Sequence, residues 1–509
     1  MMRSKERSLP GSTLLRPQPG VLLRREAQLP SDAAARRVVG LLPEAARPRA
    51  SVRDANRIAF GALWLFTLML YARPNDLLPG LGTFPLVKII ALTAPLAYLG
   101  AQLQSGRPLI RWNTEVVMVC VLLALGILLT PLAASPKDSF DMLTDTFIKT
   151  VTIFVLLTGI VHSRERLHSL FKLVTVCGLI LGLFAIRSYV RGDFATAGIR
   201  IKGLVGGMFE NPNDLATALD LLIPLALLLG VRSRGAARVF YYVSAAVMVI
   251  GVQVTFSRGG FLGLLAMAGV LFWKLGRGRR LRILLAGAIF LALISVISPN
   301  NYFTRLTTIF NIQKDATGSA QERTELLNRA LQLAVRRPVV GVGMGNFHIY
   351  SIREQEAHNS YLEIAAELGW LGLAAYLTLI FSSLLGLRRV ERETAGAESD
   401  NYRATWYFSV SLQAVFAAYL VCSFFSSIQY LWHLYYAAAY AVALRQIHHT
   451  EKAAISPPPQ TASQGATGLL LRPVRPVGSL WSSSRAKSNS GNPAPRIDQP
   501  WRTNHDAAP

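Results

Sequence analysis

The sequence predicts an all-α, polytopic membrane protein, and two observations support this fold class. Of its 509 residues, 51% are hydrophobic and only 16% are charged, which is too apolar for a soluble chain of several domains. Apolar stretches of roughly 20 residues, the length that crosses the hydrocarbon core of a bilayer, recur along the chain between polar loops. We therefore expect about twelve transmembrane helices.

The expected spans share this length and composition. Their approximate bounds are 57–72, 84–103, 115–133, 146–162, 169–187, 213–230, 238–256, 259–275, 281–299, 365–387, 404–425 and 429–446.

These spans divide the chain into five parts. In order, the parts are a basic tail (1–56), spans one to nine (57–298), a large loop containing amphipathic helices (299–364), spans ten to twelve (365–446) and a second tail (447–509). Both tails are predicted to be disordered, because their polar composition cannot bury enough apolar surface to fold. The first tail also lacks the pattern of a secretory signal peptide.

The distribution of Lys and Arg predicts which side of the membrane each loop faces. Alternate loops are rich in Arg, for example GRPLIRWN and HSRERLHS, and cytoplasmic loops collect such residues. These loops and both tails are therefore placed in the cytoplasm, and the large loop on the outer side. This bias accounts for the formal net charge of +24, so nucleic acid is not an expected partner.

The large outer loop contains the pattern of an amphipathic helix. Charged residues from Glu322 to Arg337 interleave with Leu and Ala at helical spacing, and Pro338 and the glycines of VVGVGMGNF end the pattern. The predicted helix lies on the outer face of the membrane and leads through a Gly-rich turn into the string EAHNSYLE.

Arg258 lies in VTFSRGGFLG, between two apolar stretches that form a tight hairpin. This position places its guanidinium near the hydrocarbon boundary, where an ionisable group is costly and usually faces a cavity or a partner. Two interpretations remain open, a functional cation or an Arg that extends its charge to the interface from a helix end.

Arg200 and Lys202 lie in the Gly-rich string GIRIKGLVGGMFENPNDLA, which leads into the span that begins near Asn213. Arg suits phosphate oxygens, and Gly lets a chain fold closely around a polar group. The string fits a phosphate-binding loop and equally a flexible outer loop with solvated cations. It is not a nucleotide-binding P-loop, because GxxxxGK[ST] is absent.

His358 lies in EAHNSYLE, at a loop-to-helix junction on the outer side. It is a candidate general base or hydrogen-bond donor, with Glu356 and Glu363 as orienting carboxylates, but also fits an ordinary residue at the start of a helix. His348, on the Gly-rich turn, is a competing candidate. Neither the histidines nor the cysteines show metal-ligand spacing, so no metal is expected.

Three separated strings together resemble the O-antigen ligase and O-antigen polymerase superfamily of bacterial envelopes. They are RIKGLVGGMFENPNDLA, VTFSRGGFLGLL, and the stretch from ERTELLNRAL through VVGVGMGNF to EAHNSYLEIAAELGWLGL. The third combines an Arg, a helix, a Gly-rich turn, a His-Asn pair and E-x-G-x-x-G-L in the family's order. The resemblance covers roughly Arg200 to Leu373. The earlier string YARPNDLLPGLGTFPLVKII also resembles the ligase branch associated with exosortase systems.

The resemblance implies a multi-pass protein of the bacterial inner membrane whose active site faces the periplasm. Such enzymes transfer a glycan from undecaprenyl-diphosphate to a hydroxyl of a glycan, a lipid A core or a protein among the membrane lipids, without a cofactor. By the matching strings, the implied catalytic residues are Arg200 and Arg258, which hold the diphosphate, and His358, which assists the acceptor. Arg323 matches a further recurring Arg of the family and is an expected substrate-binding residue. Lys202, which lies where the family varies, is a secondary candidate, and Asn359 and Asn213 are also expected to bind substrate.

Three other functions remain open. A polymerase would join lipid-linked repeat units, and the motifs do not separate it from a ligase because both bind a lipid diphosphate. Transporters often contain inverted repeats and broken spans, but no convincing repeat is visible here and the candidate residues gather on one side. A non-catalytic envelope scaffold would suit the basic tails, but it leaves Arg258 and the motif order unexplained.

Overall fold

The computed structural model describes residues 50–72, 86–106, 108–194, 201, 209, 211–275 and 319–455. Within these residues every regular element is a helix, and one isolated β-bridge pairs Phe194 with Ile201. The all-α prediction is thereby confirmed for the described part of the chain. Arg200, Lys202, the expected span 281–299 and most of both predicted tails lie outside it.

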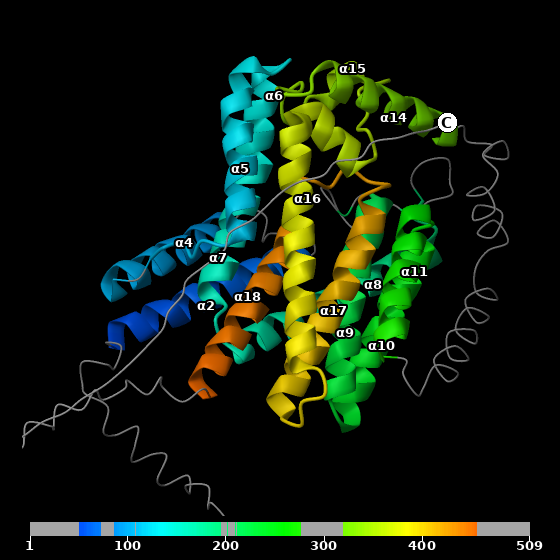
Figure 1. The fold of residues 1–509 in the computed structure, drawn as a ribbon. Coiled ribbons are helices and arrows are strands. Elements are labelled where there is room, and N and C mark those ends of the chain that lie inside the picture. Colours follow the sequence, from blue (N-terminus) through cyan, green and yellow to red (C-terminus); the bar gives the residue numbers. More distant parts are fainter. Residues whose placement is uncertain are drawn as a thin grey trace, which may run out of the picture. The chain divides into compact units, whose positions relative to one another are not determined.

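Figure 1 shows the arrangement of the described helices. Before the large loop they are α2 (Ala50–Ala72), α4 (Leu86–Ser105), α5 (Thr114–Leu129), the 3-10 helix η3 (Thr130–Leu132), α6 (Pro136–Asp141), the π-helix η4 (Met142–Phe147), α7 (Ile148–Ile160), α8 (Arg164–Arg191), α9 (Pro212–Arg232), α10 (Gly235–Val254) and α11 (Arg258–Leu275). After it come α14 (Ser319–Arg336), α15 (Phe347–Tyr350), α16 (Ser360–Thr394), α17 (Asp400–Cys422) and α18 (Trp432–Ile455).

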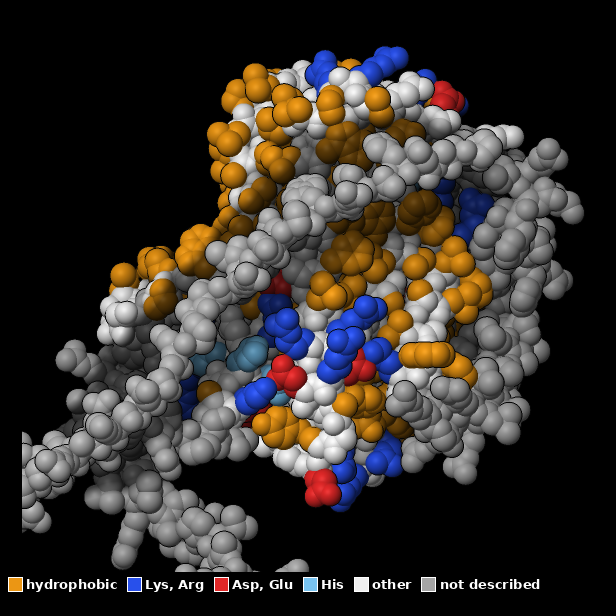
Figure 2. All heavy atoms as spheres, viewed as in Figure 1, with side chains coloured by type: hydrophobic (Ala, Val, Ile, Leu, Met, Phe, Trp, Pro, Cys, Tyr) orange, Lys and Arg blue, Asp and Glu red, His pale blue; other side chains and the backbone are white. Residues whose placement is uncertain are grey.

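Eight stretches of the described chain are helical, long and apolar enough to cross a membrane. They are Thr114–Leu132, Pro136–Ile160, Arg164–Arg191, Pro212–Arg232, Gly235–Val254, Arg258–Leu275, Ser360–Thr394 and Asp400–Cys422. Helices α2, α4 and α18 also form where spans are expected. Figure 2 shows broad areas of exposed hydrophobic side chains over α5 and α11, as expected for surfaces in contact with lipid. The chain is therefore a membrane protein.

Several helices extend beyond the spans expected from the sequence. α16 begins at Ser360, ahead of the expected start at 365, and α18 continues to Ile455, past the expected end at 446. The added part of α18 makes polar contacts with the end of α16, for example between His448 Nε2 and Glu393 Oε2 at 3.1 Å. The expected end at 446 was based on apolar composition, which does not include such contacts. The amphipathic helix predicted in the large loop is confirmed as α14, which ends at Arg336 just before Pro338.

Helix α17 is the centre of the packing, because it contacts α9, α11, α16 and α18. Its buried face repeats every three to four residues through Phe408, Leu412, Phe416 and Tyr419, each at most 4% exposed. In Figure 1, α17 stands between α16 and the pair α9 and α11. The helices α9, α11 and α16, which begin at or next to candidate residues, therefore all pack against α17.

Gly369 interrupts α16 and connects it to the Gly-rich turn of residues 341–345. Its φ is 69° and its ψ is −176°, so the helix breaks there. The carbonyls of Ala366 and Glu367 instead accept hydrogen bonds from Val342 N at 2.9 Å and Gly343 N at 3.0 Å. A Cβ at Gly369 would lie 2.6 Å from the carbonyl oxygens of both Pro338 and Val339, so only glycine fits without rearrangement.

We predict that Gly369→Ala destabilises the protein by about 2 to 4 kcal/mol, since it adds a backbone clash to an unfavourable φ. Thermal unfolding of the detergent-solubilised protein measures the effect as a lower Tm. Gly61→Ala is the matched control, because no atom lies within 4 Å of the added Cβ. An unchanged Tm for Gly369→Ala would show that the break does not depend on glycine.

Candidate active site

The His-Asn pair predicted at the start of a helix lies immediately before α16, and Asn359 is the N-cap residue of this helix. Its Oδ1 accepts hydrogen bonds from the backbone N of Tyr361 and of Leu362, both at 3.0 Å. Its Nδ2 donates to the carbonyl of Phe424 at 3.2 Å. The expected substrate-binding residue Asn359 is therefore occupied in fixing the start of α16 against the loop between α17 and α18.

Residues 423–431, which we call the α17–α18 loop, hold the start of α16 through further hydrogen bonds. Ser360 N donates to Ser423 O at 2.9 Å, and Ser360 Oγ donates to Ser426 O at 2.7 Å. Ile428 N returns a hydrogen bond to Ser360 Oγ at 2.9 Å. The position of His358 is thus set by a segment more than sixty residues later in the chain.

Glu363 joins the His358 turn to the same loop. Its Oε2 accepts hydrogen bonds from Ala357 N at 2.9 Å and from Ser427 Oγ, while its Oε1 accepts from Gln429 Nε2 at 3.0 Å. Ser427 Oγ in turn accepts from His358 N at 3.0 Å. Glu363 therefore fixes the backbone around His358, while its role in orienting the imidazole stays a prediction.

His358 has a φ of 52°, in the left-handed region that few non-glycine residues adopt. Such conformations persist only where the surrounding structure determines them, and they are frequent at functional sites. Here the determining contacts are those of Ala357, His358 and Asn359 to Glu363 and the α17–α18 loop. The strained backbone favours a functional His358 over an ordinary residue at the start of a helix.

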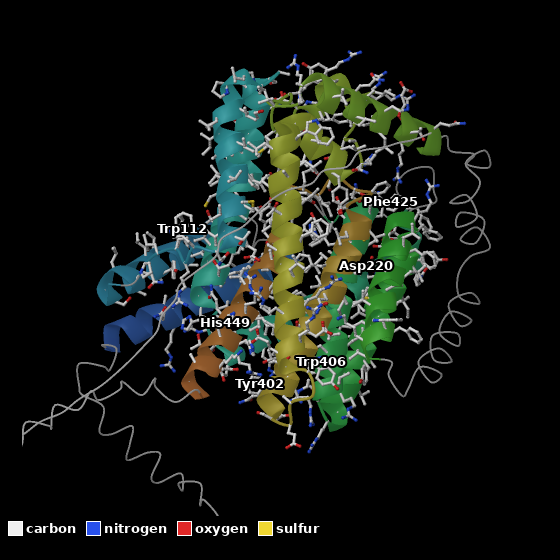
Figure 3. The ribbon with its side chains drawn as sticks, in the orientation of Figure 1. Trp112, Asp220, Tyr402, Trp406, Phe425 and His449 are labelled. Carbon is white, nitrogen blue, oxygen red and sulfur yellow. The ribbon has the colours of Figure 1, made fainter. Side chains whose placement is uncertain are left out.

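Arg258 is the first residue of α11 and is half-buried. The adjoining Gly259 allows α11 to approach the α17–α18 loop, because a Cβ there would lie 2.8 Å from Phe425 Cβ. Phe425 is labelled in Figure 3, near the ends of α11 and α17. The turn that carries Arg258 and the turn that carries His358 therefore contact the same loop.

Asn213, in the first turn of α9, joins this region from a third helix. Its Oδ1 accepts a hydrogen bond from Ser257 Oγ at 2.9 Å, next to Arg258. Asn211 caps α9 by accepting from Asn213 N at 2.9 Å. The N-termini of α9 and α11 are thus joined, and the partial positive charge at each favours an anion nearby.

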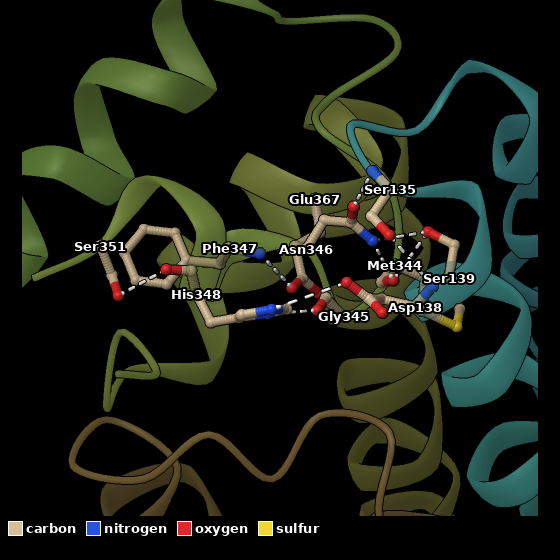
Figure 4. Close-up of polar contacts among 10 residues, drawn as sticks. All are labelled: Ser135, Asp138, Ser139, Met344, Gly345, Asn346, Phe347, His348, Ser351 and Glu367. Atoms are coloured by element: carbon tan, nitrogen blue, oxygen red, sulfur yellow. Dashed lines mark hydrogen bonds and ion pairs between the residues drawn. The ribbon is translucent and has the colours of Figure 1, made fainter. Parts of the chain in front are cut away.

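The Gly-rich turn before α15 is hydrogen-bonded to residues 135–139, which follow η3, as Figure 4 shows. Asn346 Oδ1 accepts from Ser135 N at 2.5 Å, and Asn346 Nδ2 donates to Ser139 Oγ at 2.8 Å. Ser139 Oγ donates to Met344 O at 2.9 Å. These hydrogen bonds place α6 and η4 next to the candidate site. The sequence patterns did not predict that these two helices lie there.

His348, the competing histidine, faces α6. Its Nδ1 lies 2.9 Å from the carbonyl oxygen of Gly345 and its Nε2 lies 3.7 Å from Asp138 Oδ2 (Figure 4). With Asp141, Asp145 and others, these residues line an open hollow of about 500 Å³ that reaches Glu363. Asp138, Asp141 and Asp145 are spaced by three and four residues, which places them on one face of a helix. This spacing is the sequence feature from which the acidic side of the hollow could have been predicted.

The structure therefore brings together part of the predicted set. Arg258 and Asn213 are adjacent through Ser257, and the Arg258 and His358 turns meet at the α17–α18 loop. Arg323 lies in the first turns of α14, half-buried, in the helix that packs against α16. Arg200 and Lys202 remain predictions, since they lie outside the described residues. Among the described residues no group of three or more His, Cys, Asp or Glu is arranged to hold a metal ion.

Comparison with protein families adds an independent observation. Residues 243–377 match the family model described as O-antigen ligase. This segment is similar to an O-antigen ligase domain. This domain contains Arg258, Arg323, His358 and Asn359, and it supports membership of the O-antigen ligase superfamily that the motifs suggested. A comparison with curated proteins finds no match.

The ligase domain indicates the general activity. It implies a membrane glycosyltransferase of the ligase or polymerase type, with lipid-linked glycans as donors and glycans as acceptors. The matched segment runs from α10 to the middle of α16 and so includes the Arg258 turn, the Gly-rich turn and the His358 turn. Asn213 and the α17–α18 loop, which complete the site, lie outside the matched segment.

We predict that Asn359→Ala lowers stability by about 1 kcal/mol through loss of the N-cap, and lowers kcat because His358 is no longer held in place. Asn359→Asp is the matched variant, since Asp caps helices equally well but cannot donate to Phe424 O. Thermal unfolding and steady-state glycan transfer measure the two effects. A raised KM in both variants with unchanged Tm would instead indicate direct substrate binding.

Proposed function

We propose that the protein transfers a glycan from undecaprenyl-diphosphate to an acceptor hydroxyl at the periplasmic face of the bacterial inner membrane. The observation that carries this proposal is the meeting of two turns at one loop. Gly259, next to Arg258, packs on Phe425, and His358 N donates to Ser427 Oγ. Arg258, a cation, and His358, a candidate base, are one hundred residues apart in sequence, and their turns both contact the α17–α18 loop.

The diphosphate of the donor is expected at the Arg258 end of the site. The guanidinium suits phosphate oxygens, and the adjoining N-termini of α9 and α11 add partial positive charge. As the bond between the anomeric carbon and the diphosphate oxygen breaks, its electron pair passes to the diphosphate. Arg258, together with the predicted Arg200, would stabilise this developing charge.

The acceptor is activated at the other end of the site. Its hydroxyl oxygen attacks the anomeric carbon, and a neutral His358 takes the hydroxyl proton, an assistance worth a factor of about 10² to 10⁴ in rate. This direct displacement would invert the anomeric configuration. Glu363 contributes indirectly, because it holds the backbone of the His358 turn.

We predict that Arg258→Ala lowers kcat for glycan transfer by about 10² to 10³, because charge on the departing diphosphate loses its partner. Arg258→Lys, which keeps the charge but not the bidentate geometry, should recover only part of the rate. The assay uses purified full-length protein, labelled lipid-linked glycan and a candidate acceptor. Full activity of Arg258→Ala would exclude this role, and elongation without a second acceptor would identify a polymerase.

We predict that His358→Asn lowers kcat by about 10² to 10⁴ with little change in the KM for the donor. Asn tolerates a positive φ, so the turn should keep its conformation. The same substitution at His348 is the matched comparison and should retain more activity. If His348→Asn alone abolished transfer, His348 would replace His358 as the base.

A further inference from the structure

A groove of about 610 Å³ lies between α11 and α16, far from the candidate active site. It is lined by residues from 266 to 274 of α11 and by residues from 388 to 395 at the end of α16, and both helices pack against α17. Arg258 begins α11 and Lys274 is its next-to-last residue, so about 24 Å of helix separate them at a rise of about 1.5 Å per residue. The groove therefore lies toward the opposite face of the membrane, which the Arg-rich loops predict to be cytoplasmic.

The α16 side of the groove carries uncompensated positive charge. Arg388 and Arg392 are both exposed there, one helical turn apart. Lys274 Nζ donates to both carboxylate oxygens of Glu391, at 2.6 and 2.5 Å, so these two charges neutralise each other. Within the part of the chain that the structure describes, neither Arg388 nor Arg392 forms an ion pair. The groove thus keeps two cations for an anion from outside the protein.

The rest of the groove is apolar, and an apolar strip continues from it along α16. Val270 and Trp273 line the α11 side, and Trp273 is 71% exposed. On α16, Phe381 and Leu385 precede Arg388 by seven and three residues, which places the three on one face of the helix. Phe381 is 50% exposed and Leu385 is 62% exposed. Figure 2 shows Lys and Arg side chains gathered over the lower part of α16, with hydrophobic side chains beside them over α11.

We propose that this groove binds an anionic phospholipid, with its phosphate between Arg388 and Arg392 and an acyl chain along Phe381 and Leu385. The planar guanidinium group matches phosphate oxygens, and basic pockets between transmembrane helices suit anionic headgroups. Trp273 fits this position, because Trp is enriched where a membrane meets water. The proposal concerns a second site and does not depend on the transferase function.

The arrangement of the charges favours an anionic lipid over other occupants. Glu391 is held by Lys274 and also accepts a hydrogen bond from Gln413 Nε2 of α17 at 2.9 Å, so it is not available to the arginines. Two like charges four residues apart destabilise a helix, and a bound phosphate would remove the repulsion between Arg388 and Arg392. A soluble anion would leave the apolar strip unused, and a zwitterionic lipid would bring its own cation to the arginines.

Trp273 provides a local probe for the test. Full-length protein is reconstituted in phosphatidylcholine nanodiscs that contain increasing fractions of either brominated phosphatidylglycerol or brominated phosphatidylcholine. Bromine on an acyl chain quenches indole fluorescence at short range, and subtracting the signal of Trp273→Phe isolates the contribution of Trp273. We expect phosphatidylglycerol to quench this contribution at a mole fraction about tenfold lower than phosphatidylcholine.

Arg388→Gln combined with Arg392→Gln should abolish most of this preference, because the phosphate loses both cations. The matched control combines Arg389→Gln with Arg403→Gln. It removes two exposed cations near the junction of α16 and α17 that do not line the groove, and it should leave the preference unchanged.

Gly269→Leu tests the location of the lipid without changing the charge. Gly269 lines the groove, and a Cβ there meets no atom within 4 Å, so the added side chain enters open space that the acyl chain would occupy. We expect the preference for phosphatidylglycerol to fall severalfold. Gly61→Leu is the matched control, because its added side chain also enters open space, but on α2.

Four results would overturn the proposal. Equal quenching by the two lipids, or a preference that survives loss of Arg388 and Arg392, would exclude selective binding by these cations. Equal effects of the two double variants would indicate diffuse attraction of anionic lipid to the whole basic face. A preference unaffected by Gly269→Leu would place the lipid outside the groove. Relief of quenching by soluble glycerol 1-phosphate, which lacks acyl chains, would indicate a site for a soluble anion.

Discussion

The buried carboxylate of Glu363 is the interaction on which the candidate site depends. It accepts hydrogen bonds from Ala357 N, Ser427 Oγ and Gln429 Nε2, and so ties the turn before α16 to the loop between α17 and α18. A carboxylate buried at this depth is tolerated only where several donors surround it. One of these donors, Ser427 Oγ, also accepts the hydrogen bond from His358 N, so the contacts of Glu363 and the position of the His358 turn are linked.

The break in α16 at Gly369 positions the Gly-rich turn of residues 341–345. Freed carbonyls of Ala366 and Glu367 pair with the Gly-rich turn, and that turn carries His348 toward Asp138. The side of the hollow formed by Gly345 and His348 is therefore positioned by hydrogen bonds between the interrupted helix and the loop. The Arg258 turn lies where the N-termini of α9 and α11 are joined, whereas the hollow beside His348 lies next to an interrupted helix.

Much of the fold could be predicted from the sequence, because spans and amphipathic helices carry periodic apolar patterns. α14 and its end before Pro338, and the tight hairpin at Arg258, were predicted in this way and are present. The early start of α16 and the extension of α18 were not, because they depend on capping by Asn359 and on hydrogen-bonded pairs such as His448 with Glu393. Mean hydropathy is an average over neighbouring residues in the sequence, so it contains no information on contacts between two particular side chains.

The sequence by itself determined that the chain is a helical membrane protein with Arg258 and His358 at the ends of helices, since local composition and motif order encode both. The tertiary structure alone decided that their turns meet at residues 423–431, that Asn213 joins through Ser257, and that aspartates on α6 and η4 face His348. The physical reason is sequence separation. Contacts between segments more than forty residues apart are fixed by how helices pack around α17, which no local pattern describes.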